Sequence, residues 1–177
     1  WLEFPAKGGD SPDIGVKVQG KEARYVRHHS SMIRGDGLTW VSASGVEDAE
    51  SILVMPRIDP PKKPARRGAS GTDKAKAPDE TEPPADEPTR AYTVRLYFAE
   101  LNKIAEGDRR FGVRLQGESV LEDFDVVREA GGARRCLIRE FKGIQIGKDL
   151  RIDLARAEVT KLGPLISGVE LIAENPL

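Results

Sequence analysis

The sequence predicts an all-β protein, a two-sheet antiparallel β-sandwich of the jelly-roll type with one long disordered insertion. Short segments with apolar residues at alternate positions recur along the chain, and this is the period of a strand that has one face on a core. Turn residues separate these segments at the short spacing of sandwiches. No stretch of the 177 residues shows sustained helical periodicity.

The clearest strand pattern lies between residues 92 and 124. Val94, Leu96 and Phe98 alternate with polar or amphipathic residues, and the same alternation repeats at 111–115. The tripeptide Gln116-Gly117-Glu118 then supplies a tight turn into a further apolar segment. This region therefore predicts antiparallel sheet.

Shorter alternating segments predict the remaining strands. Gly35-Asp36-Gly37 reads as a turn between two strands or irregular extended segments, and Gly131-Gly132 reads as another turn. The further strands are expected at residues 1–4, 14–18, 25–33, 38–45, 51–55, 134–141, 144–146, 150–154 and 165–173.

The alternating pattern breaks at about residues 60–90. This segment is rich in proline and has no aromatic residue, and its first half is basic while its second half is acidic. Such a segment has little to bury and cannot offset the entropy of ordering it. The part before it, about sixty residues with few large apolar side chains, is too short for a confident independent fold. The sequence thus predicts a single domain over residues 1–177, interrupted by a flexible insertion.

Charge and composition exclude some function classes. With 28 basic and 29 acidic residues, the net charge is -1, so no global field attracts nucleic acid or an anionic membrane. No apolar run is long enough to cross a bilayer. The first residue is Trp1 in an expected strand, which suggests a piece of a larger protein. The single Cys136 reads as a small buried hydrophobe of a strand.

The titratable residues form no recognisable catalytic or metal-binding constellation. Glu122, Asp123 and Asp125 lie close together, and a solvated acidic rim, a calcium site and acid/base catalysis are the alternatives for them. His28 and His29 are the only histidines, and neighbours in an extended chain point to opposite faces, which disfavours shared metal binding. The sequence therefore predicts no enzyme, no cofactor and no metal.

Four long segments resemble the malectin domain, a carbohydrate-binding β-sandwich with a galactose-binding-like fold. They are YTVRLYFAE, FGVRLQGESVLEDFDVVREAGG, CLIREFKGIQI and PLISGVELIAE, and they cover roughly residues 92–174. The resemblance implies a non-catalytic accessory module of a larger extracytoplasmic bacterial protein, in the periplasm, at the cell surface or secreted. The expected partners are a glycan and other domains of the parent protein, without nucleic acid or membrane insertion.

Sugar binding requires exposed aromatic faces that stack on a pyranose, with polar groups that read its hydroxyls. Phe98, Phe111, Phe124 and Phe141 alternate with polar neighbours and are expected in the core. The candidates for a carbohydrate site are Trp40, Tyr25, His28, His29 and Asp36.

The resemblance does not carry the binding residues of malectin over to this chain. In malectin, adjacent aromatics follow the FAE-like strand and an acidic residue precedes the last strand. Here the corresponding residues are Leu101-Asn102-Lys103-Ile104 and Leu162-Gly163-Pro164. A structural or protein-interaction domain without a sugar site therefore stays open as the second hypothesis. A groove that holds Trp40 or Tyr25 would favour the first hypothesis, and burial of both residues in the core would favour the second.

Overall fold

The structure is a computed structural model, and it describes residues 14–56 and 89–174. The strand predicted at residues 1–4 lies outside this part of the chain, and so does nearly all of the predicted insertion at about 60–90.

The described residues form eleven strands and three short helices. The helices are η1 (Ser30–Met32), α1 (Thr39–Ser42) and α2 (Val126–Ala130). The strands are β1 (Ile14–Gln19), β2 (Arg24–Arg27), β3 (Ser44–Glu47), β4 (Ser51–Pro56), β5 (Arg90–Phe98), β6 (Phe111–Leu115), β7 (Glu118–Phe124), β8 (Leu137–Ile146), β9 (Leu150–Arg156), β10 (Leu165–Ile166) and β11 (Gly168–Ala173).

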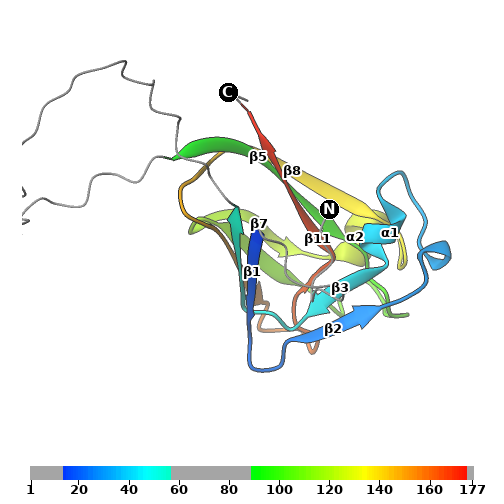
Figure 1. Cartoon of the computed structure of the whole chain (residues 1–177). Helices are drawn as coiled ribbons and strands as arrows, with labels where there is room; N and C mark the ends of the chain where they lie inside the picture. The colour runs from blue at the N-terminus through cyan, green and yellow to red at the C-terminus, as the bar shows by residue number, and fades with distance from the viewer. Residues whose placement is uncertain (1–13, 57–88, 175–177) are drawn as a thin grey trace, which may run out of the picture.

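The strands build antiparallel sheets that face each other across one core, as predicted. One sheet has five strands in the order β1-β4-β9-β6-β7, and the other two have the orders β11-β5-β8 and β10-β3-β2. β10 leads into β11 after a single residue, so the two small sheets adjoin. Figure 1 shows β5, β8 and β11 running together, with β1 and β4 in the opposite layer. The architecture is a β-sandwich.

Strands from both sides of residues 57–88 pair with each other. Ile52 of β4 is the Cα partner of Ile152 of β9, and Val46 of β3 is the partner of Ile166 of β10. The sandwich therefore needs both parts of the chain. The single domain over residues 1–177 stays a prediction, because parts of that range lie outside the described residues.

The core joins the two layers through three phenylalanines. The ring centroid of Phe98 on β5 lies 6.1 Å from that of Phe111 on β6 and 4.8 Å from that of Phe124 on β7. All three are buried, which confirms the prediction from alternation. Phe141 is only partly buried and packs at the margin of the same core.

The turn after β6 also follows the prediction. Gln116 and Gly117 both have a positive φ, of 52° and 86°. Two positive values in succession are the signature of the type I′ hairpin turn, whose twist matches that of the flanking strands. Glycine tolerates this conformation without strain.

Two short helices replace predicted extended or turn segments. Thr39–Ser42 forms α1, and of the predicted strand at 38–45 only residues 44 and 45 lie in a strand, β3. Similarly, η1 ends the predicted strand at 25–33 after Arg27. Helices of three or four residues make at most one turn, so hydrophobic periodicity cannot reveal them.

The third helix, α2, had a local signal that the prediction missed. The Asp125 side chain accepts a hydrogen bond from the backbone N–H of Arg128 at 3.1 Å, which is N-capping. Gly131 follows in the left-handed conformation with φ 69°, which is the usual helix end. An Asp and a Gly six residues apart therefore delimit this helix.

The carboxylate of Glu174, directly after β11, makes a pH-dependent contribution to stability. Glu174 Oε1 accepts hydrogen bonds from the Gly143 backbone N–H at 2.7 Å and from Thr93 Oγ1 at 2.9 Å. The Gly143 hydrogen bond, with a smaller contribution from Thr93, lowers the pKa of Glu174. A lowered folded-state pKa means stability that is present above the unfolded pKa and lost as pH falls through the folded one.

We expect Glu174→Gln to lower the thermal midpoint modestly at pH 7 and to have a smaller effect at pH 3, because protonation of Glu174 removes the charge that the two hydrogen bonds stabilise. Thermal unfolding of the two proteins at both pH values measures this. A difference of equal size at both pH values would contradict the assigned role of the charge.

Candidate functional site

A buried ionic network supports the loops at one end of the sandwich. Arg109 has only 2% of its surface exposed, and Glu47 and Glu100 have 1% and 0%. Arg109 Nη2 lies 2.6 Å from Glu47 Oε1, and its Nε lies 2.7 Å from Glu100 Oε2. Its Nη1 donates to the Gly163 carbonyl at 2.5 Å. One guanidinium therefore links β3, the end of β5 and the loop before β10.

The same network extends into the loop that follows β5. Asn102 donates through its backbone N–H to Glu100 Oε1 and through Nδ2 to Glu47 Oε1, both at 2.9 Å. Arg24 of β2 adds an exposed guanidinium whose Nη2 lies 2.7 Å from Glu47 Oε2. The carboxylates are thus satisfied on several sides, as buried charges must be.

Burial separates the aromatic residues of the described chain into core and surface. Tyr92 and Tyr97 are 8% and 3% exposed, whereas Tyr25 and Trp40 are 49% and 53% exposed. Burial, together with the hydrogen bond that the Tyr97 hydroxyl donates to Glu170, raises the pKa of Tyr97 to about 12. Only Tyr25 and Trp40, among the described aromatics, therefore present large ring surfaces to solvent.

The five predicted site residues lie on β2, α1 and the loop between them. Tyr25 is on β2, and His28 directly follows this strand. The His28 backbone N–H donates to the Ala43 carbonyl at 2.7 Å, so the end of β2 adjoins the end of α1, which carries Trp40. His29 is exposed and caps η1, since its Nδ1 accepts from the Ser31 N–H. Asp36 is exposed in the loop before α1.

This loop is held against the segment that precedes β8. The Arg34 N–H donates to the Arg134 carbonyl at 2.9 Å, and the Cys136 N–H donates to the Arg34 carbonyl at 2.8 Å. Ser42 Oγ on α1 lies 2.8 Å from Cys136 Sγ. Cys136 is half-buried against a small apolar cluster rather than fully buried within a strand, which corrects its predicted environment.

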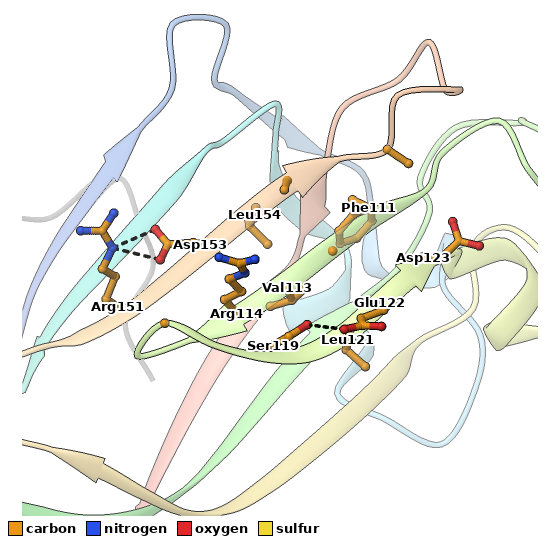
Figure 2. Close-up of a pocket in the computed structure, with 14 residues that line it drawn as sticks. Phe111, Val113, Arg114, Ser119, Leu121, Glu122, Asp123, Arg151, Asp153 and Leu154 are labelled. Atoms are coloured by element: carbon orange, nitrogen blue, oxygen red, sulfur yellow. Dashed lines mark hydrogen bonds and ion pairs between the residues drawn. The ribbon is translucent and has the colours of Figure 1, made fainter.

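A second surface feature is a hollow of about 700 Å³ on the outer face of the five-stranded sheet. Figure 2 shows Arg114 at its middle, between the Arg151–Asp153 ion pair and the hydrogen bond that joins Ser119 to Glu122. No carboxylate of the described residues forms an ion pair with Arg114. Sequence reasoning did not single out this hollow, although outward alternation on β6 and β9 places its charged residues on one face.

The hollow lacks the aromatic surface of the β2–α1 region. Phe111 contributes to its lining, but the residue is 0% exposed and belongs to the core. The outward-facing partners Gly112 and Ala155 leave space there because their side chains are absent or small. The hollow can therefore offer hydrogen bonds and charge to a ligand, but no stacking platform.

The acidic residues 122–125 have structural partners. The Asp125 carboxylate caps α2 and also accepts from the Gly107 N–H at 2.5 Å, and Arg110 Nε donates to Asp123 Oδ1 at 2.5 Å. Glu122 accepts from Ser119 at 3.1 Å. Within residues 14–56 and 89–174, no group of three or more His, Cys, Asp or Glu residues is placed to hold a metal ion.

Comparison with known proteins decides the family. The model of the malectin domain matches residues 87–174, from the start of β5 through β11. The chain belongs to the malectin domain family. The resemblance found in the four sequence segments is thereby confirmed.

Curated relatives of the malectin domain are plant receptor proteins. Receptor-like protein 4 of Arabidopsis thaliana is 36% identical over 70 residues, which are 38% of this chain and 11% of that protein. The nodulation receptor kinase of Pisum sativum is 35% identical over 86 residues, 48% of this chain and 9% of that protein. The match thus spans about a tenth of each relative.

Solved structures share the sandwich at low sequence identity. The ANXUR1 extracellular domain of Arabidopsis thaliana superposes with a TM-score of 0.61 at 8% identity, over 93% of this chain and 41% of that one. A β-glucuronidase 2 of Bacteroides uniformis, in a calcium-binding mutant, gives a TM-score of 0.57 at 14% identity, over 91% of this chain and 14% of that one. These likenesses concern the fold alone.

The buried network of this malectin domain was not anticipated from sequence. Arg109 stands in the polar segment EGDRRF, which reads as a solvated loop, and Glu47 lies 62 residues away. Charged residues are almost never fully buried unless they are paired, so only the tertiary structure identifies these partners.

In the described part of the chain, no helix is long and apolar enough to cross a membrane.

Proposed function

We propose that this malectin domain is a non-catalytic saccharide-binding module of a larger extracytoplasmic protein. The observation that carries the proposal is the half-exposed state of Tyr25 and Trp40, on β2 and α1. A large aromatic ring exposed at a loop-bearing end of a sandwich is the surface that stacks on a sugar ring. Core packing, the main competing role for both residues, is inconsistent with this exposure.

Polar groups of the same region supply the remaining chemistry of the proposed site. His28 lies at the junction of β2 and α1, and His29 and Asp36 are exposed in the adjoining loop. Imidazole and carboxylate groups accept or donate hydrogen bonds to sugar hydroxyls. The Arg109 network holds the neighbouring loop after β5, so that the loops of this end have a rigid base.

The extracytoplasmic setting is supported by the names of the relatives. They are receptor proteins, and one solved neighbour is an extracellular domain. The bacterial source implied by the resemblance stays a prediction. Other domains of the parent protein are proposed as further partners, because the relatives are much longer than the matched segment.

A structural domain that packs on a neighbouring domain is the second candidate. Its support is that the sandwich of the Bacteroides β-glucuronidase is only 14% of that chain. This candidate expects Tyr25 and Trp40 to contact a protein surface rather than a glycan. Binding of an isolated saccharide by the chain separates the two candidates.

We expect Trp40→Ala to abolish retention of the protein on a glycan array without unfolding it. Trp40 is 53% exposed, so truncation removes the stacking surface but little core packing. Array retention and the thermal midpoint are measured on the same preparations.

Val159→Ala is the control, because Val159 is 78% exposed and lies in the loop between β9 and β10, outside β2 and α1. It should leave retention unchanged. Unchanged retention of Trp40→Ala would remove this residue from the site, and global unfolding would assign it to the core.

A further inference from the structure

Two arginines occupy paired positions where the β2–α1 loop meets the segment before β8. Arg34 and Arg135 form an isolated bridge of the parallel type. Hydrogen bonds from the Arg34 N–H to the Arg134 carbonyl and from the Cys136 N–H to the Arg34 carbonyl hold the two backbones together. Bridged residues project to the same side, and both arginines are exposed.

This arrangement places two like charges close together without compensation. Like charges at directly paired positions are destabilising. Other arginines of the described residues are compensated: Arg109 pairs with Glu47 and Glu100, and Arg139 pairs with Glu129. Neither Arg34 nor Arg135 forms an ion pair with a carboxylate of the described residues. This includes Asp36, which lies in the same loop as Arg34. An anion that binds between them would relieve the repulsion.

The arginine pair is tied to the helix that carries Trp40. Cys136, next to Arg135, lies 2.8 Å from Ser42 Oγ of α1. Gly37, between Arg34 and α1, approaches so closely that an added Cβ would lie 2.1 Å from Cys136 Sγ. The loop, α1 and the segment before β8 therefore pack as one unit, and the charges and the exposed ring belong to the same end of the sandwich.

We propose that Arg34 and Arg135 form the anion-binding part of the saccharide site, so that the module prefers acidic saccharides. Guanidinium groups present paired N–H donors that match carboxylate and sulfate oxygens. A ring of the sugar would lie against Trp40 while its acidic group lies between the two guanidiniums. This inference rests on the proposed function and adds the chemical class of its ligand.

The acidic group could be the carboxylate of a uronic acid or a sulfate ester, and the probes distinguish these two sources. Binding of the full 177-residue chain to alginate oligosaccharides, sulfated dextran oligosaccharides and unsubstituted dextran oligosaccharides of similar length is measured by calorimetry. The wild type is expected to bind at least one acidic probe roughly tenfold more tightly than the neutral probe, an advantage that corresponds to about one charge-assisted contact. Tighter binding of alginate identifies the carboxylate, and tighter binding of sulfated dextran identifies the sulfate.

The variants are Arg34→Gln, Arg135→Gln and the double substitution. Because the bridge is held by backbone hydrogen bonds, the variants should keep the fold, which the thermal midpoint checks. Arg156→Gln removes the same charge from an exposed position on β9 and serves as the control. The double variant should lose the acidic preference, roughly tenfold, and its remaining affinity should depend less on salt. Arg156→Gln should leave the preference unchanged.

The outcomes separate this inference from the proposed function. Equal wild-type affinity for the acidic and neutral probes overturns the inference. The proposed saccharide-binding function still stands in that case if Trp40→Ala abolishes binding. An equal loss in Arg156→Gln and in the double variant also overturns it, because the effect is then one of net charge. Acidic binding that needs both arginines but survives Trp40→Ala supports the anion site and removes the stacking platform from the proposed function.

Discussion

Replacement of Arg109 by leucine is expected to lower the free energy of unfolding by about 3–5 kcal/mol, since removal of one member of a buried ionic group leaves uncompensated charge. Arg109 is 2% exposed and contacts two carboxylates that are themselves buried, Glu47 and Glu100. Leucine fills part of the volume but donates no hydrogen bond. Both carboxylates would then keep only their other partners, and the Gly163 carbonyl would lose its donor.

The neighbouring residue offers a matched control. The side chain of Arg110 is 32% exposed, and its partner Asp123 is 48% exposed. A surface pair of this kind contributes about 0–1 kcal/mol, so Arg110→Leu should have a small effect. Urea unfolding of both variants measures the difference. Losses of similar size would mean that the Arg109 network contributes no more than a surface ion pair.

The Arg109 network also has a consequence for the proposed site. Asn102, in the loop after β5, is held by the two carboxylates that Arg109 organises. If Arg109→Leu folds at low temperature, we expect amide hydrogen exchange in residues 101–108 to be faster in this variant than in the wild type. Protection equal to that of the wild type would separate the network from the order of this loop.

The second large effect is expected at the junction of the two layers. Phe98→Ala should destabilise the domain by about 3–5 kcal/mol, as truncation of a fully buried phenylalanine does when the cavity cannot collapse. Phe98 is 0% exposed, and its ring contacts those of Phe111 and Phe124 from the opposite sheet. Because its partners lie on a different sheet, the loss weakens the packing between layers.

Phe141→Ala is the control for the aromatic chemistry. Phe141 is partly buried at the margin of the same core, so its truncation removes less apolar area from the folded state. Thermal or urea unfolding should show a clearly smaller loss than for Phe98→Ala. Equal losses would indicate that the three-ring cluster is not the centre of the core.

Local sequence was sufficient for the strands and the core of this protein. Val94, Leu96 and Phe98 are buried on one face because a strand alternates its side chains, and this period is visible in the sequence. The same holds for Phe111, and for the turn at Gln116 and Gly117. Each of these features depends on residues that are near one another along the chain.

The short helices show where local patterns become insufficient. α1 is four residues long and has no side-chain N-cap, so neither periodicity nor capping distinguishes it from an extended segment. α2 is also short, but it has Asp125 as a cap and Gly131 at its end. The cap residues of α2 are visible in the sequence and could have predicted this helix. α1 has no such local signal, and it packs against β3, β5 and η1, which are tertiary contacts.

The candidate site was anticipated only in part. Residue type limited the aromatic candidates, and alternation assigned the phenylalanines to the core. Whether Tyr25 and Trp40 were buried or exposed could not be deduced, because β2 and α1 are covered or left open by segments distant in sequence. The pairing of Arg34 with Arg135 is of the same kind, since about a hundred residues separate the two.

The sequence by itself determined that this protein is a β-sandwich with a phenylalanine core and a malectin-type central region, since strand alternation and turn chemistry act over a few residues. The tertiary structure alone decided that Arg109 is buried between Glu47 and Glu100, and that the rings of Tyr25 and Trp40 remain half-exposed. The physical reason is that burial and charge compensation depend on neighbours in space, which the folded chain brings together from β2, β3, β5 and the loops between the strands.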